Sequence, residues 1–173
     1  LEQASFEVIL LPDNPMDLDT DEYAFPIRLL ATGPVSPARK RDAGARESRG
    51  EFLAFIDDDA YPFPDWLAKA APYLEDSSVA AVGGPQLTAP GDSFTARVSG
   101  AVYASPLNGR AACRYVPCPG LKTTDDWPSV NLIVRKRDFL AAGGFDSHFW
   151  PGEDTILCMH LTHTLGKTIR HAP

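Results

Sequence analysis

Residues 51–59 read Glu-Phe-Leu-Ala-Phe-Ile-Asp-Asp-Asp, an apolar run that passes directly into three carboxylates. Five of the six residues before the first Asp are apolar, which is typical of a strand covered on both faces of a sheet. Ligands of open α/β sheets bind beyond the carboxyl ends of strands, and a hard divalent cation neutralises such a cluster of acids. The stretch therefore predicts a metal-dependent site for a phosphate-containing ligand at Asp57, Asp58 and Asp59. The alternative is a solvated acidic turn.

The composition bounds the class of protein. A chain of 173 residues is long enough for one domain with a hydrophobic core, and we expect residues 1–173 to form a single domain. The formal net charge of -7 argues against a general nucleic-acid binder or a binder of anionic membranes. The longest apolar runs are far too short to cross a bilayer. Because residue 1 is Leu rather than Met, we expect a piece of a longer protein, in which any membrane segment lies outside these residues.

The cysteines and histidines point to no metal site of their own. Cys113, Cys118 and Cys158 form neither an even set nor a Cys-x-x-Cys pair, so a disulfide framework or a zinc site is not expected. Reduced thiols of a cytoplasmic protein are the favoured interpretation, and a Cys113–Cys118 pair under oxidising conditions is the alternative. His160 and His163 offer at most two ligands on one helix, so structural roles are expected for the histidines.

Apolar periodicity and turn residues predict alternating strands and helices. Strands are expected at 6–11, 26–30, 51–56, 79–82, 130–134 and 167–170. Helices are expected at 37–48, 65–74, 93–104, 137–142 and 153–165, the first of them capped by Ser36 and started by Pro37. Residues 105–128 are rich in Pro and Gly and are expected to be irregular. Strands that alternate with helices indicate an α/β fold, with a mostly parallel central sheet flanked by helices.

A second acidic pair, Glu153-Asp154, follows Trp150-Pro151-Gly152 and begins the helix expected at 153–165. Acids in the first turn of a helix complement its dipole, so capping is one interpretation. Two acids after an aromatic-Pro-Gly turn also suit presentation into a cleft, where a carboxylate takes a proton from an attacking hydroxyl group. The pattern leaves both interpretations open.

Three further features extend the candidate site. Residues 39–46 read Arg-Lys-Arg-Asp-Ala-Gly-Ala-Arg, a basic helix that suits a nucleotide diphosphate or is a solvated face. Asp13 follows the first expected strand, where its carboxylate accepts from a ribose hydroxyl or a base N–H or forms an Asx turn. Trp127 precedes the strand at 130–134; a packed Trp is favoured there over a sugar-binding surface.

Taken in order, these features resemble family 2 glycosyltransferases, the large group of inverting enzymes with the GT-A fold. The matching stretches are FEVILLPDNP at 6–15, PARKRDAGARESRGEFLAFIDDDAYPFPDWL at 37–67 and NLIVRKRDFLAAGGFDSHFWPGEDTILCMHL at 131–161. In that family another strand and helix usually precede the strand that ends at Asp13, whereas five residues precede Phe6 here. The resemblance therefore implies a GT-A-like fragment of a catalytic domain, with its first nucleotide-binding strand missing.

The resemblance also implies roles for the residues on the donor side. Asp57-Asp58-Asp59 is similar to the family's Asp-x-Asp motif. Asp59 would bind the metal on the donor diphosphate, Asp57 would contact ribose or metal, and Asp58 would belong to the same donor site. Asp13 is similar to the Asp that binds the base or ribose, and Arg41 would lie near the nucleotide.

On the acceptor side, the resemblance implies that Asp154 is the general base and that Glu153 orients the acceptor or the base. His171 lies about where some members supply a late metal ligand. The implied reaction transfers a sugar from a nucleotide-diphosphate donor, with UDP-sugars favoured, to a hydroxyl of a saccharide or lipid-linked acceptor. A single displacement inverts the anomeric configuration, and Mn²⁺ or Mg²⁺ stabilises the departing diphosphate.

Two other classes of function stay open at this point. Metal-dependent nucleotidyl- or phosphotransferases also place acids at strand ends, although no Gly-rich P-loop is present. The third hypothesis is a non-catalytic, truncated domain that serves in assembly, and an open sheet edge would allow a homodimer. The expected location is cytoplasmic, including the inner face of the membrane for the longer protein.

Overall fold

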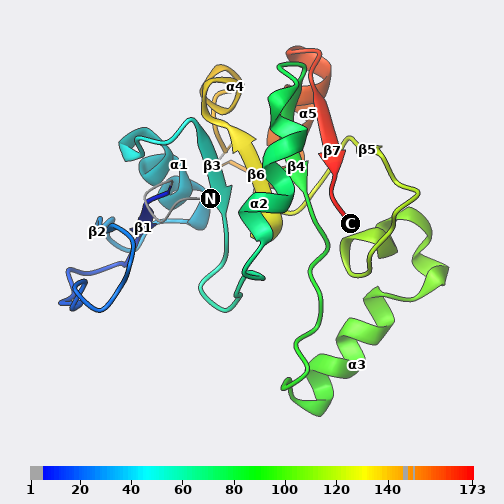
Figure 1. Ribbon diagram of the computed structural model, residues 1–173, viewed down its shortest axis with the longest axis horizontal. Coiled ribbons are helices and arrows are strands. Elements are labelled where there is room, and N and C mark those ends of the chain that lie inside the picture. Colours follow the sequence, from blue (N-terminus) through cyan, green and yellow to red (C-terminus); the bar gives the residue numbers. More distant parts are fainter. Residues whose placement is uncertain (1–5, 146–147, 150) are drawn as a thin grey trace.

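The computed structural model describes residues 6–145, 148–149 and 151–173, and it has the layers of an α/β protein (Figure 1). The strands are β1 (Val8–Leu10), β2 (Ile27–Leu29), β3 (Phe52–Phe55), β4 (Val79–Gly83), β5 (Thr123–Thr124), β6 (Leu132–Arg135) and β7 (Thr168–His171). The α-helices are α1 (Pro37–Glu47), α2 (Trp66–Ala70), α3 (Phe94–Tyr103), α4 (Lys136–Ala141) and α5 (Glu153–Met159). Short helical turns are η1 (Ala71–Glu75), η2 (Pro106–Arg114), η3 (Ser129–Asn131) and η4 (His160–Thr164).

The strands form two sheets. β1 and β2 pair in parallel, and the larger sheet has the order β3-β6-β4-β7-β5. In the larger sheet β4 and β7 are parallel, whereas β6 is antiparallel to both β3 and β4, and β5 is antiparallel to β7. The expected α/β class is confirmed, but the expectation of a mostly parallel sheet is wrong for the larger sheet, which is mixed.

The reversed direction of β6 follows from the path of the chain between β4 and β6. β4 ends at Gly83, which pairs with Leu132 at the start of β6. The Gly84 N–H donates to the Asn131 carbonyl at 3.3 Å, so the chain leaves and re-enters the sheet at the same edge. A strand that starts where its neighbour ends must run antiparallel to it, and residue periodicity carries no information about that direction.

Three strands therefore end at one edge of the larger sheet, which we call the carboxyl edge. β3 and β4 are both antiparallel to β6, and β7 is parallel to β4. The expectation that residues 51–56 form a strand covered on both faces is wrong in one respect. β3 is the outermost strand of its sheet, and Leu53 is buried while Phe52 and Ala54 are exposed.

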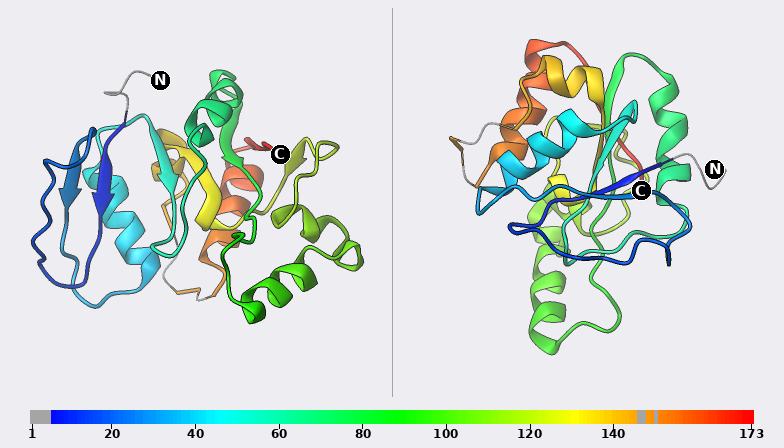
Figure 2. Two further views of the ribbon diagram at one scale, coloured as in Figure 1. Left: turned by 60° about the horizontal axis from the view of Figure 1, so that its bottom comes forward. Right: turned by 90° about the vertical axis from the view of Figure 1, so that its left-hand side faces the viewer.

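Helices cover both faces of the larger sheet. The end-on view shows α1, α4 and α5 on one face and α2 on the other (Figure 2, right). The first face encloses the larger hydrophobic cluster, which includes Trp127, Phe139 and Leu157. The second encloses Leu74 and Ile133, with Trp66 and Leu67 of α2 packed against them, as the amphipathic pattern at 65–74 predicted.

The helix α1 connects the two sheets. Ser36 caps it by accepting from the Arg39 N–H, and Pro37 starts it, as predicted. Its buried side packs on the core through Ala38 and Ala45. Gly44 lies against the Leu11 side chain, 3.0 Å from where a Cβ would stand, so the smallest side chain lets α1 approach β1 closely.

The segment between β4 and β6 holds more order than expected. Residues 105–128 were expected to be irregular, but they contain η2 and β5. Cys113 and Cys118 form a disulfide and Cys158 is free and buried, so the expectation of reduced thiols is wrong for the first two. Loop proximity brought the two cysteines within bonding reach, with their Cα atoms 5.4 Å apart. α3 is confirmed within the expected 93–104, and it projects away from the sheet (Figure 1). No helix among the described residues is long and apolar enough to span a membrane.

Candidate functional site

The acidic triplet forms a turn at the carboxyl edge. β3 ends at Phe55, and the Ala60 N–H donates to the Asp57 carbonyl at 3.1 Å. This early turn leaves Asp58 and Asp59 exposed and Asp57 half-buried. Three carboxylates thus point away from the core at the edge where α/β proteins bind ligands.

Arg41 joins the two acidic motifs of the sequence. Its Nη2 atom lies 2.7 Å from Asp57 Oδ1, and its Nη1 atom lies 3.1 Å from Glu153 Oε1. The guanidinium also lies 5.6 Å from the centre of the Phe145 ring, within the range of a cation–π contact. The planar guanidinium of Arg41 therefore joins the carboxylates of Asp57 and Glu153, which are 96 residues apart in the sequence.

The turn after α4 positions the Phe145 ring against Arg41. The Asp42 carboxylate accepts from the Phe145 N–H at 2.9 Å. Gly144 has a φ of 77° and lies so close that a Cβ would stand 2.6 Å from Asp42 Oδ1. Burial raises the pKa of the Asp42 carboxyl above its ordinary value, and the Phe145 N–H opposes that rise. The Gly-Gly-Phe part of the predicted motif thus anchors the ring beneath Arg41.

Glu153 and Asp154 occupy the first turn of α5, after a turn in which Gly152 has a φ of 124°. Glu153 is buried, and its Oε2 accepts from the Gly152 N–H at 3.1 Å. Asp154 accepts from the Ser129 N–H at 3.3 Å and from the Thr155 N–H at 2.9 Å. Backbone donors therefore hold the Asp154 carboxylate in place without a cationic partner among the described residues, which suits a group that must accept a proton.

Two residues of the predicted motifs, Asp146 and Trp150, lie outside the described residues.

Asp13 is held by the same helix as Asp57. Lys40 Nζ lies 2.5 Å from Asp13 Oδ1 and donates to the Leu11 carbonyl at 3.2 Å. The consecutive α1 residues Lys40 and Arg41 therefore contact Asp13 and Asp57, respectively. The basic helix is thus more than a solvated face, although Arg39 on the same helix is exposed.

The oxygen atoms of the acidic turn suit a divalent cation, but the turn does not surround an ion on all sides. Its carboxylate oxygens are the ligands that Mg²⁺ and Mn²⁺ prefer, and no side-chain partner of Asp58 or Asp59 occurs among the described residues. Within the same part of the chain, no group of three or more His, Cys, Asp or Glu side chains is arranged to hold a metal. The site therefore fits an ion that takes one or two carboxylates and completes its coordination with phosphate oxygens.

His171 is not brought to the acidic turn. Phe55 pairs with Leu132, Leu132 with Gly83, and Gly83 with His171, so three strand spacings, about 14 Å, separate β3 from His171. The His171 ring is buried against Trp127, with ring centres 4.9 Å apart. Neither ring nitrogen reaches a partner at normal hydrogen-bond geometry among the described residues. Burial lowers the pKa of His171, and the nearby Gly83 backbone opposes that shift.

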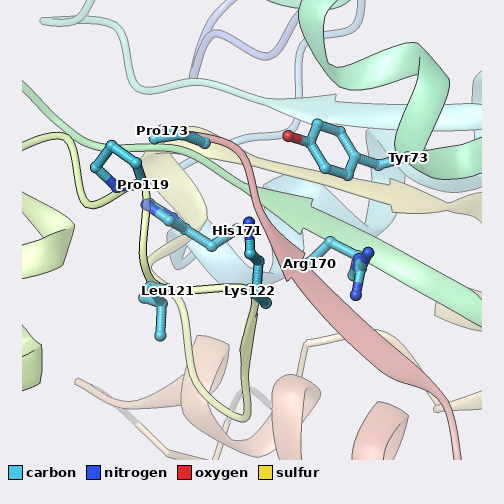
Figure 3. A pocket seen from close by; sticks show the side chains of 7 residues that line it. All are labelled: Tyr73, Pro119, Leu121, Lys122, Arg170, His171 and Pro173. Atoms are coloured by element: carbon cyan, nitrogen blue, oxygen red, sulfur yellow. The ribbon is translucent and has the colours of Figure 1, made fainter.

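A hollow of about 270 Å³ at the end of β7 is lined by His171 and by residues around the C-terminal segment. Figure 3 shows Lys122 and Tyr73 among its lining side chains. None of the residues predicted for the acidic turn or for the α5 terminus lines it. The hollow is therefore separate from the candidate site.

Sequence reasoning missed a polar network beside Asp154. The Thr155 hydroxyl donates to Asp126 Oδ1 at 3.0 Å, and Arg114 forms an ion pair with the same Asp126 carboxylate. Asp126 precedes Trp127, whose indole N–H donates to the Gly84 carbonyl at 3.0 Å, so the favoured packed interpretation of Trp127 is confirmed. The signal in the sequence was the acidic pair at 125–126 directly before a Trp.

The comparisons with known proteins address the fold and the family. A family model described as Glycosyl transferase family 2 matches residues 2–128, a range that contains Asp13, Arg41 and the acidic triplet but not Glu153 or Asp154. The chain is 30% identical over 139 residues to the pre-mycofactocin glycosyltransferase of Mycobacterium tuberculosis strain H37Rv. That match covers 79% of this chain, and the chain spans 28% of the length of that relative.

Two solved structures show the same fold. A mannosyltransferase from Pyrobaculum calidifontis, in complex with GDP-Man and Mn²⁺, superposes with a TM-score of 0.67 at 18% identity. The likeness covers 96% of this chain and 45% of that chain. GalNAc-T7 with UDP, GalNAc and Mn²⁺ superposes with a TM-score of 0.64 at 14% identity, over 96% of this chain and 36% of that chain. The expected GT-A fold is confirmed. The family match over most of the chain, together with this fold, shows that the chain belongs to glycosyl transferase family 2.

Proposed function

We propose that this chain transfers a sugar from a nucleotide-diphosphate donor to an acceptor hydroxyl group, with inversion at the anomeric carbon and with help from a divalent metal ion. The observation that carries the proposal is the Arg41 fork, which joins Asp57 of the acidic turn to Glu153 beside Asp154. Donor-side and acceptor-side carboxylates then face one site at the carboxyl edge. We further propose that residues 1–173 act as one catalytic unit.

On the donor side, Asp57 and Asp59 would hold Mn²⁺ or Mg²⁺, and Asp58 would contribute to the same donor pocket. Asp13 would accept from the ribose or base, since half of its side chain is exposed. Arg41 would lie beside the diphosphate. A bound divalent ion supplies positive charge to the departing diphosphate.

On the acceptor side, Asp154 would take the proton of the acceptor hydroxyl as its oxygen attacks the anomeric carbon. The new C–O bond forms on the face opposite the breaking bond to the diphosphate oxygen, so the configuration inverts. The centre gains oxocarbenium character, as in other glycosyl chemistry. Glu153, which is buried and bound to Arg41, would orient the base or the acceptor. No covalent intermediate on the protein is required.

The nucleotide of the donor is proposed from the sequence resemblance and from the related folds. UDP-sugars are the favoured donors, which is consistent with GalNAc-T7 in complex with UDP. The Pyrobaculum mannosyltransferase was solved with GDP-Man, so a GDP-sugar is the donor to test alongside. The proposed acceptor is a hydroxyl group of a saccharide or of a lipid-linked molecule, at a cytoplasmic location.

The test compares wild-type protein with Asp154→Asn and with Glu75→Gln, which neutralises an exposed acid of η1. Each protein is incubated with Mn²⁺, UDP-sugars or GDP-mannose, and a panel of saccharide acceptors. Removing a general base lowers turnover by about 10²–10⁴-fold, so Asp154→Asn should lose transfer while UDP binding is kept. Glu75→Gln should match wild type.

Product analysis separates the proposed reaction from other transferases. Release of UDP or GDP with an inverted glycoside supports the proposal, whereas transfer of a nucleoside monophosphate would indicate a nucleotidyltransferase. Undiminished turnover of Asp154→Asn would remove Asp154 from the mechanism. Absence of nucleotide binding by the wild-type chain would favour a non-catalytic domain.

A further inference from the structure

Arg41 lies between the donor side and the acceptor side of the proposed site, which bind different substrates. Its Nη2 atom binds Asp57 in the donor-side acidic turn, and its Nη1 atom binds Glu153 beside the proposed base. The fork is well ordered by its surroundings, because only 16% of the Arg41 side chain is exposed and the Phe145 ring lies under the guanidinium. A single cation thus serves two carboxylates from opposite parts of the chain.

Arg41 also neutralises the acidic turn as it stands. Asp57, Asp58 and Asp59 are adjacent in sequence, and like charges this close repel one another. The neighbouring cation Lys40 is engaged by Asp13 and by the Leu11 carbonyl. Among the residues that the structure describes, the cation placed on the triplet is the Arg41 guanidinium.

The two ion pairs of Arg41 differ in how far their carboxylates are exposed to water. The Asp57 side chain is 37% exposed, whereas the Glu153 side chain is 6% exposed. Water screens an exposed ion pair strongly, while a buried carboxylate that loses its cation is left without compensation. The fork should therefore open at Asp57 and hold at Glu153 when another cation competes for the acidic turn.

We propose that Arg41 is the resident counter-cation of the acidic turn, that it yields Asp57 to a divalent metal ion, and that it then stays with Glu153. Arg41 is thus a positioning residue that couples metal loading on the donor side to the carboxylate next to the base. The inference rests on the proposed metal-assisted function. It adds that metal affinity depends on Arg41 and, through Arg41, on Glu153.

The first test measures Mn²⁺ affinity by isothermal titration calorimetry, without donor or acceptor, on the 173-residue chain. Arg41→Gln removes the guanidinium charge that competes with the metal ion for Asp57. Without the repulsion between that charge and Mn²⁺, the variant should bind Mn²⁺ about tenfold more tightly than wild type, at solvent-like screening. Arg41→Lys keeps the charge and should change the affinity much less. Arg39→Gln is the matched control, because it removes one positive charge from an exposed position of the same helix, and it should match wild type.

The second test asks whether Glu153 acts through Arg41. Glu153→Gln removes the buried partner, so Arg41 holds Asp57 more firmly and Mn²⁺ affinity should fall several-fold. In the Arg41→Gln background the same substitution should leave Mn²⁺ affinity nearly unchanged. A direct effect of the Glu153 charge on the ion would instead persist in both backgrounds, and that result would overturn the coupling.

A measurement on the wild-type protein covers the case in which Arg41→Gln does not fold. On saturation with diamagnetic Mg²⁺, the NMR signals of the Arg41 guanidinium should shift, and those of Arg39 should stay in place. Unchanged Arg41 signals at saturation, or equal Mn²⁺ affinity of Arg41→Gln and wild type, overturn the inference and leave the proposed function standing. Where Mn²⁺ uptake by wild type requires phosphate oxygens, the same variants are compared with saturating UDP present. If wild type takes up no Mn²⁺ either alone or with UDP, both the inference and the metal-assisted function are wrong.

Discussion

Gly83→Ala tests how much the close contact between β4 and Trp127 contributes to the stability of the fold. Gly83 ends the fully buried strand β4 and pairs with Leu132 on one side and His171 on the other. A Cβ at this position would lie 2.7 Å from Trp127 Nε1 and closer still to the Cδ1 and Cγ atoms of the same ring. Trp127 is 1% exposed, so its indole has no free space to move into.

The magnitude follows from two terms. Overpacking a well-filled core typically costs 1–3 kcal/mol of unfolding free energy. The displaced indole N–H would also lose its hydrogen bond to the Gly84 carbonyl, which adds about 1 kcal/mol. The total of about 2–4 kcal/mol corresponds to a fall in melting temperature of about 4–16 °C for a chain of this size.

The assay is urea denaturation followed by tryptophan fluorescence and circular dichroism. Gly91→Ala is the control, because no atom of the described residues, its two chain neighbours aside, lies within 4 Å of a Cβ built there. The change in unfolding free energy should stay within about 0.5 kcal/mol. Combining Gly83→Ala with Trp127→Leu should cost less than the sum of the two single substitutions, since the smaller side chain relieves the clash. A Gly83→Ala protein as stable as Gly91→Ala would refute the reasoning.

Three further predictions concern stability and thiol chemistry. Burial lowers the pKa of His171 in the folded state, so the unfolded chain binds the proton more strongly. This contribution to stability is fully present above about pH 6.5 and is lost as pH falls from there through the lower folded-state pKa. His171→Leu should therefore narrow the difference between the urea midpoints at pH 7.5 and pH 5. Ser36→Ala removes the cap of α1 and should cost about 1 kcal/mol in urea denaturation, whereas an unchanged midpoint would contradict the capping role. Cys113 and Cys118 are paired, and burial raises the pKa of the Cys158 thiol to about 12. Under non-reducing conditions, thiol labelling should therefore find no fast-reacting thiol in the native protein and one in the denatured protein. A rapidly labelled thiol in the native protein would contradict the disulfide or the burial of Cys158.

The local pattern was sufficient to predict most of the helices and strands. Ser36 and Pro37 marked the start of α1, and the apolar stripe at 65–74 correctly predicted the face that α2 buries. Caps and apolar periodicity act through neighbours within one or two helical turns, so the sequence contains the whole of their cause.

Two of the errors concern relations between distant segments, and the third concerns a local loop. The run at 51–56 was expected to be covered on both faces, yet β3 is the outermost strand and exposes Phe52 and Ala54, because apolar character does not determine which segments flank a strand. The direction of β6 depended on where the chain re-enters the sheet. The pairing of Cys113 with Cys118 was the alternative to the favoured reduced thiols, and the loop between η2 and β5 brings these two cysteines together.

Two clusters of carboxylates and a basic helix, in an order that resembles family 2 glycosyltransferases, can be read from the amino-acid sequence alone. The three-dimensional fold was needed to see that Arg41 binds one carboxylate from each cluster and that His171 packs on Trp127, away from both. Residue types determine which charges are available, but ion pairing acts over a few ångströms, and only the folded chain brings Arg41 of α1, the turn after β3 and the start of α5 within that range.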